Sequence, residues 1–99
     1  NRMRFPLQVL AAVREEIGAD VCMGIRISAD EFVQGGLTLE DMGRIVPAIT
    51  ASVPVDFVNV SHSAYHGSYS LSTQMADMSF DPSSFRHLAP QIRKSLRAA

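Results

Sequence analysis

The chain has 99 residues and a mass of 10.8 kDa, a length that suits one small domain rather than two. Hydrophobic residues make up 46% and charged residues 19% of the sequence, a balance typical of a folded protein and not of a disordered one. The net charge of −1 argues against a strongly basic nucleic-acid binder, and the single cysteine excludes an internal disulfide. No apolar run is long enough to span a membrane and no secretory signal opens the chain, so we expect a cytoplasmic protein that binds neither nucleic acid nor membrane.

The first two elements are predicted from their hydrophobic spacing. Apolar residues recur every three or four positions between Phe5 and Ile17, which predicts a helix that begins near Arg4 and ends at Gly18. Residues 21–28 then form a short, largely apolar run between polar residues, which is typical of a buried strand.

A second helix and a second strand follow a loop at residues 29–37. Thr38, with Asp41 three positions later, has the pattern of a helix N-cap. Pro47 falls inside this helix, where we expect it to kink or shorten the helix. Residues 55–61 are rich in β-branched and aromatic side chains and predict a second buried strand.

The last third of the chain combines a long polar stretch with a third helix. Residues 62–80 are rich in serine. Asp81 and Pro82 then have the pattern of a helix start, and Pro90 implies a bend further along. The apolar stripe of this helix consists of Phe85, Leu88, Ala89, Ile92 and Leu96.

The predicted order is helix, strand, helix, strand, helix, with the two strands as parallel neighbours. Both strands lack the polar alternation of a surface sheet, so each requires cover on two faces. Three helices are too few to cover both faces of the sheet and to close its edges as well. The chain also begins at Asn1 rather than Met, so we expect residues 1–99 to be a segment of a larger α/β domain.

Each strand has one aliphatic face and one mixed face that becomes polar toward its carboxyl end. The mixed faces consist of Cys22, Gly24, Arg26 and Ser28 in the first strand and of Phe57, Asn59 and Ser61 in the second. This pattern is typical of the interior of a (β/α)₈ barrel near its catalytic mouth. An open doubly wound sheet is the alternative, because its ligands also bind at the carboxyl ends of the strands.

Arg26 is the principal candidate for a binding residue. It lies between Ile25 and Ile27 in an apolar strand, so its burial requires an anion or several acceptors nearby. A bound ligand and a structural ion pair with an acid on a neighbouring strand both satisfy this requirement. Asn59 lies on the corresponding face of the second strand, as a second pocket candidate or as a core amide.

The segment at 62–80 follows a strand, where barrel enzymes keep their specificity loops. His62 and Tyr65 are substrate-binding candidates by this position alone, and a mobile serine-rich loop is the alternative. His62 and His66 are four residues apart, but glycine and serine disfavour a helix here and no third ligand is in reach, since we expect Cys22 to be buried. We therefore predict no metal site, and Ser61 and Ser63 lack the glycines of a hydrolase nucleophile elbow.

Four sequence runs together resemble the Old Yellow Enzyme family of NADH:flavin oxidoreductases, and more narrowly the branch that holds trimethylamine dehydrogenase and dienoyl-CoA reductase. These runs are NRMRFPLQVLAAVR (1–14), VCMGIRISADE (21–31), GGLT (35–38) and DFVNVS (56–61). The resemblance implies a (β/α)₈ TIM barrel that holds FMN at its mouth. This chain would be its middle, from the fourth helix to the sixth, in a single FMN-binding domain.

The resemblance also implies a role for Arg26. Family members carry an arginine at this position of the fifth strand, directed at the pyrimidine edge of the flavin. A fixed guanidinium there stabilises the negative charge of the reduced cofactor. The FMN phosphate site and any iron–sulfur cluster would lie outside residues 1–99, so we expect the segment alone to bind FMN poorly and to be inactive.

The leading hypothesis is therefore a segment of an FMN-dependent oxidoreductase that moves hydride between flavin and a substrate. The substrate would be an N-methylated amine, or an activated alkene with NAD(P)H as donor. The alternative is a non-catalytic α/β fragment that self-associates or docks with a complementary fragment through its exposed sheet edges and apolar faces.

Overall fold

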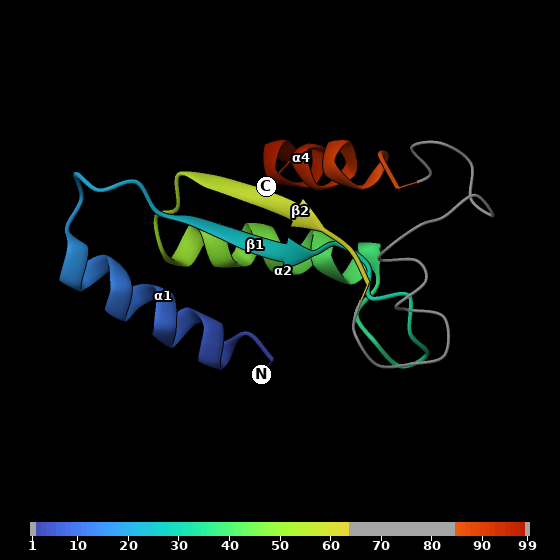
Figure 1. Ribbon diagram of the computed structural model, residues 1–99, viewed down its shortest axis with the longest axis horizontal. Coiled ribbons are helices and arrows are strands. Elements are labelled where there is room, and N and C mark those ends of the chain that lie inside the picture. Colours follow the sequence, from blue (N-terminus) through green and yellow to red (C-terminus); the bar gives the residue numbers. More distant parts are fainter. Residues whose placement is uncertain (1, 64–84, 99) are drawn as a thin grey trace.

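The computed structural model describes residues 2–63 and 85–98. Over these residues the elements follow one another as α1 (Arg4–Ile17), β1 (Gly24–Ser28), α2 (Leu39–Ser52), β2 (Phe57–Ser61) and α4 (Leu88–Ala98) (Figure 1). The predicted α/β class and the order helix, strand, helix, strand, helix are confirmed.

The two strands form a parallel sheet, as predicted. Gly24 pairs with Phe57, and the register continues to Ser28 opposite Ser61. Both arrows in Figure 1 point the same way, so the carboxyl ends of the strands lie at one edge of the sheet. Paired residues of a parallel sheet share a face, and the mixed faces of the two strands therefore form one continuous surface.

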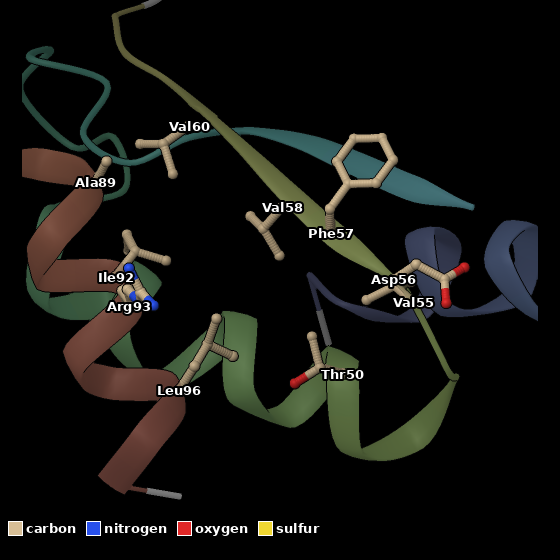
Figure 2. Close-up of a pocket in the computed structure, with 10 residues that line it drawn as sticks. All are labelled: Thr50, Val55, Asp56, Phe57, Val58, Val60, Ala89, Ile92, Arg93 and Leu96. Carbon is tan, nitrogen blue, oxygen red and sulfur yellow. The ribbon is translucent and has the colours of Figure 1, made fainter. Parts of the chain in front are cut away.

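The hydrophobic core lies between the aliphatic face of the sheet and the helices α2 and α4. Val46 of α2 and Ile92 of α4 are the most deeply buried large side chains among the described residues, at 0% and 1% exposure. Val58 and Val60 of β2 pack against this core. Figure 2 shows them directed toward α2 and α4, where an apolar groove of about 420 Å³ remains between the strand and the two helices.

Replacing Ile92 by alanine should lower the free energy of unfolding of the full-length protein by about 3 kcal/mol, because a cavity would replace a fully buried side chain. Lys94→Ala on the exposed side of the same helix is the control and should change stability by less than about 0.5 kcal/mol. Chemical denaturation of the two variants checks this prediction. Equal denaturation midpoints for the two variants would show that the burial of Ile92 does not stabilise the protein.

The mixed face of the sheet has no helix against it among the described residues. Phe57 is 54% exposed, and Figure 2 shows its ring on the side of β2 opposite to Val58. The ring occupies the space beside Gly24, where a Cβ atom would overlap it. The expected burial of Arg26 and Cys22 is therefore wrong for the structure described, in which both residues are exposed because no described segment covers this face.

Helix α1 lies beside β1 (Figure 1) and has no buried residue. Its apolar stripe remains exposed at Phe5, Val9 and Val13. The helix begins at Arg4 and is capped by Gly18 in the left-handed region with a φ of 79°, as its sequence predicts. Because α1 buries so little surface, other contacts must fix its position.

Among the described residues, one arginine of α1 makes such contacts. Arg14 donates hydrogen bonds to the carbonyl oxygens of Gly18, Val21 and Pro54, at 3.1, 2.8 and 2.9 Å for the shortest bond to each, and forms an ion pair of 3.2 Å with Asp56. Its side chain is only 15% exposed. Arg14 thus ties the end of α1 to the segments that precede both strands.

Asp56 makes this tie sensitive to pH. Its carboxylate accepts the Met23 N–H at 2.8 Å and the Arg14 guanidinium, and these two bonds hold the pKa of Asp56 below its ordinary value of 3.8. A lowered pKa in the folded state stabilises the fold above the unfolded pKa, and this contribution is lost as the pH falls through the folded value.

Asp56→Asn should therefore lower the thermal midpoint of the full-length protein at pH 7, and the difference from wild type should shrink as the pH falls below about 4. Thermal melts across this range check the prediction. A difference that is constant with pH would show that the charge of Asp56 contributes nothing.

Helices α2 and α4 depart from prediction at their prolines. Thr38 and Asp41 form the predicted capping box. Of the two effects expected of Pro47, a kink or a shortened helix, the shortening does not occur, because α2 continues through Pro47 to Ser52. In α4, Phe85–His87 form a turn and the helix begins at Leu88, later than predicted. Pro90 then falls in the first turn, where no backbone hydrogen bond of the helix requires its nitrogen. The predicted start at Asp81 and Pro82 lies outside the described residues.

Candidate functional site

The polar row predicted on the mixed face of the sheet is present. Arg26 pairs in register with Asn59, and its guanidinium Nη2 donates to the Ser61 hydroxyl oxygen at 3.3 Å. Both Arg26 and Asn59 are exposed. Within residues 2–63 and 85–98 Arg26 forms no ion pair, so the described part of the chain gives no support to the structural alternative for this residue.

His62 follows β2 directly, but it lies in an aromatic cluster rather than in the polar row. Its ring stacks on Phe85 at 4.5 Å between centroids and meets the edge of Phe32 at 6.2 Å. Its Nδ1 lies 2.9 Å from the Ser63 hydroxyl oxygen. Burial lowers the pKa of His62 below its ordinary value of 6.5, which favours the neutral imidazole at physiological pH.

The other predicted residues of the 62–80 segment, Tyr65 and His66, lie outside the described residues. In the part of the chain that the structure covers, no three His, Cys, Asp or Glu side chains are placed to hold a metal ion. No helix in that part is long and apolar enough to cross a bilayer.

The loop between β1 and α2 carries residues that the sequence reasoning missed. Asp30 accepts the N–H of Phe32 at 2.9 Å and that of Leu39 at 3.3 Å, while Glu31 accepts that of Leu37 at 2.6 Å. A pair of acidic residues shortly after a strand and before a glycine turn is the signal that could have indicated these hydrogen bonds.

Two grooves remain on the aliphatic side of the sheet. One lies between β2, α2 and α4 (Figure 2), and the other, of about 460 Å³, lies between α1, β1 and α2. Apolar residues dominate both linings. The charged residues that line them are Asp56 and Arg93 in the first groove and Arg2 and Arg26 in the second. The polar row is therefore the best candidate for chemistry.

The fold and this row define the class of protein. A parallel α/β unit with a guanidinium, an amide and a hydroxyl toward the carboxyl ends of adjacent strands is the arrangement that binds polar ligands in such folds. A fixed guanidinium suits a planar or electron-rich group, because its donors lie in one plane and its charge is permanent.

Comparisons with known proteins agree with this class. Residues 1–92 match the model of the NADH:flavin oxidoreductase / NADH oxidase family, and the chain belongs to that family. The match confirms the family resemblance found in the sequence. The names of the relatives are consistent with the trimethylamine dehydrogenase-like branch.

Several relatives align along most of the chain, and two of them are at least 36% identical to it. An N,N-dimethylglycine/sarcosine dehydrogenase from Chromohalobacter salexigens is 44% identical over 94% of this chain and 13% of its own length. An NADH oxidase from Thermoanaerobacter brockii is 36% identical over 95% of this chain and 14% of its own length. A probable N-methylproline demethylase from Rhizobium meliloti is 35% identical over 61% of this chain and 9% of its own length. The chain thus spans about one seventh of the relatives it matches most fully, and no solved structure matches it.

The residues present fit a flavin. A flavin offers carbonyl oxygens and ring nitrogens along its pyrimidine edge, and Arg26, Asn59 and Ser61 offer donors to such acceptors from one exposed face. The Arg26 guanidinium also carries a permanent positive charge, which suits an electron-rich ring.

Proposed function

We propose that this chain is the central part of an FMN-binding TIM barrel in an FMN-dependent oxidoreductase. The observation that supports the proposal most is the exposed Arg26 guanidinium, placed with Ser61 and Asn59 on the uncovered face of two parallel strands. In a closed barrel this face is the interior, where a cofactor at the mouth would meet it.

Each residue of the polar row has a role in this proposal. FMN, when bound, supplies the centre that accepts or donates hydride. Arg26 would bind and orient the pyrimidine edge, and Ser61 would hold the guanidinium in place through their 3.3 Å hydrogen bond. Asn59 would contribute an amide beside Arg26, toward the cofactor or the substrate.

We propose an N-methylated amine as the substrate of the full-length protein. The support lies in the relatives, two of which are named for the oxidation or demethylation of N-methylated amino acids. An activated alkene with NAD(P)H as donor is the second candidate, and the NADH oxidase relative favours a nicotinamide partner. His62 and Tyr65 are our substrate-side candidates by their position after β2, and any iron–sulfur cluster would lie outside this chain.

The alternative of a non-catalytic, self-associating fragment is supported only by exposed apolar side chains such as Phe5 and Phe57. The barrel proposal explains the same exposure, since neighbouring strands and helices would cover these positions. The family match favours the enzyme.

Purification of the full-length protein tests this function. We expect a yellow protein that releases about one FMN per chain on denaturation, and anaerobic bleaching of its flavin absorbance by N,N-dimethylglycine or sarcosine. Bleaching by NADH alone would favour the alkene alternative. A colourless oligomer would contradict the enzyme and favour association.

A further inference from the structure

One residue connects the two loops that leave the carboxyl ends of the strands. The carboxylate of Asp30 accepts two N–H groups of its own loop, from Phe32 at 2.9 Å and from Leu39 at 3.3 Å. Its backbone carbonyl accepts the N–H of Ser63, beyond β2, at 2.7 Å. Asp30 therefore links the loop before α2 to Ser63, the second residue after β2.

Both segments contain a backbone conformation that requires such support. Phe32 and Ser63 have φ angles of 52° and 71°, in the left-handed region that residues other than glycine rarely adopt. Conformations of this kind persist only where the surrounding contacts enforce them, and they concentrate at functional sites. The hydrogen bonds of Asp30 reach the backbone nitrogens of these two residues.

The two residues also hold His62 in place. Phe32 contacts the His62 ring with its edge, and its own ring lies 5.3 Å from that of Phe85. The Ser63 hydroxyl engages the Nδ1 atom of His62. Two of the contacts to the imidazole thus come from residues whose backbone is bound to Asp30, and the stacked ring of Phe85 supplies another.

We propose that Asp30 is a positioning residue for the reaction: by binding the backbone of Phe32 and Ser63, it holds His62 and the start of the following segment at the mouth of the barrel. This inference rests on the proposed function, because it takes the carboxyl ends of the strands to be the substrate side. Asp30 itself touches neither cofactor nor substrate in this proposal.

Asp30→Ala in the full-length, FMN-loaded protein tests the proposal, with Asp41→Ala as the matched control. Asp41 also binds a backbone N–H, that of Thr38 at 3.1 Å, but no bond in the described structure joins it to the segment after β2. Hydrogen exchange by mass spectrometry reports on the amides of residues 31–39 and 62–63. Steady-state kinetics with N,N-dimethylglycine report on the site.

We expect Asp30→Ala to raise exchange at least tenfold in residues 31–39, because two hydrogen bonds to the carboxylate are lost, and to raise KM about tenfold, with a smaller change in kcat. Exchange at residues 62–63 should also rise, because the loosened loop no longer fixes the Asp30 carbonyl that accepts the Ser63 N–H. Asp41→Ala should raise exchange only near the start of α2 and leave KM unchanged. Asp30→Asn keeps one side-chain carbonyl oxygen as an acceptor and replaces the alanine variant in the test if that variant does not fold. It should give values of exchange and KM between those of the wild type and Asp30→Ala.

Two results would overturn the proposal, and they are distinguishable. If the wild type is yellow and active but Asp30→Ala leaves KM and the exchange of residues 62–63 unchanged, the role of Asp30 is refuted while the proposed function stands. If the wild type holds no flavin, the proposed function fails and the positioning role fails with it, even where exchange shows that the two loops are coupled.

Discussion

Arg26→Ala should weaken FMN binding to the full-length protein by about 10- to 100-fold, because hydrogen bonds to a charged group contribute roughly 1.5–3 kcal/mol each. The guanidinium is exposed on the uncovered face of the sheet and bonds to Ser61 there. The flavin reduction potential should also become more negative, since a fixed positive charge beside the ring favours the electron-rich form. Flavin fluorescence titration and a dye-coupled potential measurement give the two values.

Two further variants interpret this result. Arg26→Lys keeps the charge and loses the planar donors. We therefore expect the flavin reduction potential to stay close to that of the wild type and the affinity for FMN to fall in part. Arg44→Ala removes an exposed arginine of α2 whose ion pairs among the described residues are with Asp41 and Glu40, and it should change neither quantity. Equal affinity and potential in Arg26→Ala and wild type would contradict the assignment of Arg26 to the flavin.

Arg14→Met should be the most destabilising of the arginine replacements, by on the order of 3 kcal/mol in the free energy of unfolding. Methionine keeps the aliphatic bulk but leaves the carbonyls of Gly18, Val21 and Pro54 without their donor, and it leaves Asp56 without its cation. Helix α1 has no buried side chain to compensate for these losses.

Arg44→Met is the matched control for this variant. The Arg44 side chain is 73% exposed, whereas that of Arg14 is 15% exposed. Exposed ion pairs contribute little, so Arg44→Met should lower stability by less than about 1 kcal/mol. Urea denaturation of both variants checks the difference. Similar midpoints would show that other parts of the protein, and not Arg14, fix α1.

The sequence was sufficient to predict the elements whose signals are local. Hydrophobic spacing and end signals located α1 with its Gly18 cap and the Thr38 capping box, and strand composition located β1 and β2. The period of two also predicted that Arg26 and Asn59 share a face, because parallel pairing preserves that alternation.

Features that depend on distant parts of the chain were not predictable in this way. The exposure of Arg26 depends on what covers the sheet, and strand composition alone does not determine this cover. The tie of Arg14 to Pro54 joins residues 40 positions apart, and helical periodicity places Arg14 only on a polar face. The bond from Ser63 to Asp30 depends likewise on the pairing of two strands that are separated by a helix.

The central claim is that the mixed face of β1 and β2 meets the flavin through Arg26, and a crystal structure of the full-length protein with FMN bound tests it most directly. Our account predicts a guanidinium nitrogen of Arg26 within about 3.2 Å of an acceptor on the pyrimidine edge of the flavin. Arg26 paired instead with a protein carboxylate, on a face covered by another part of the chain, would contradict it.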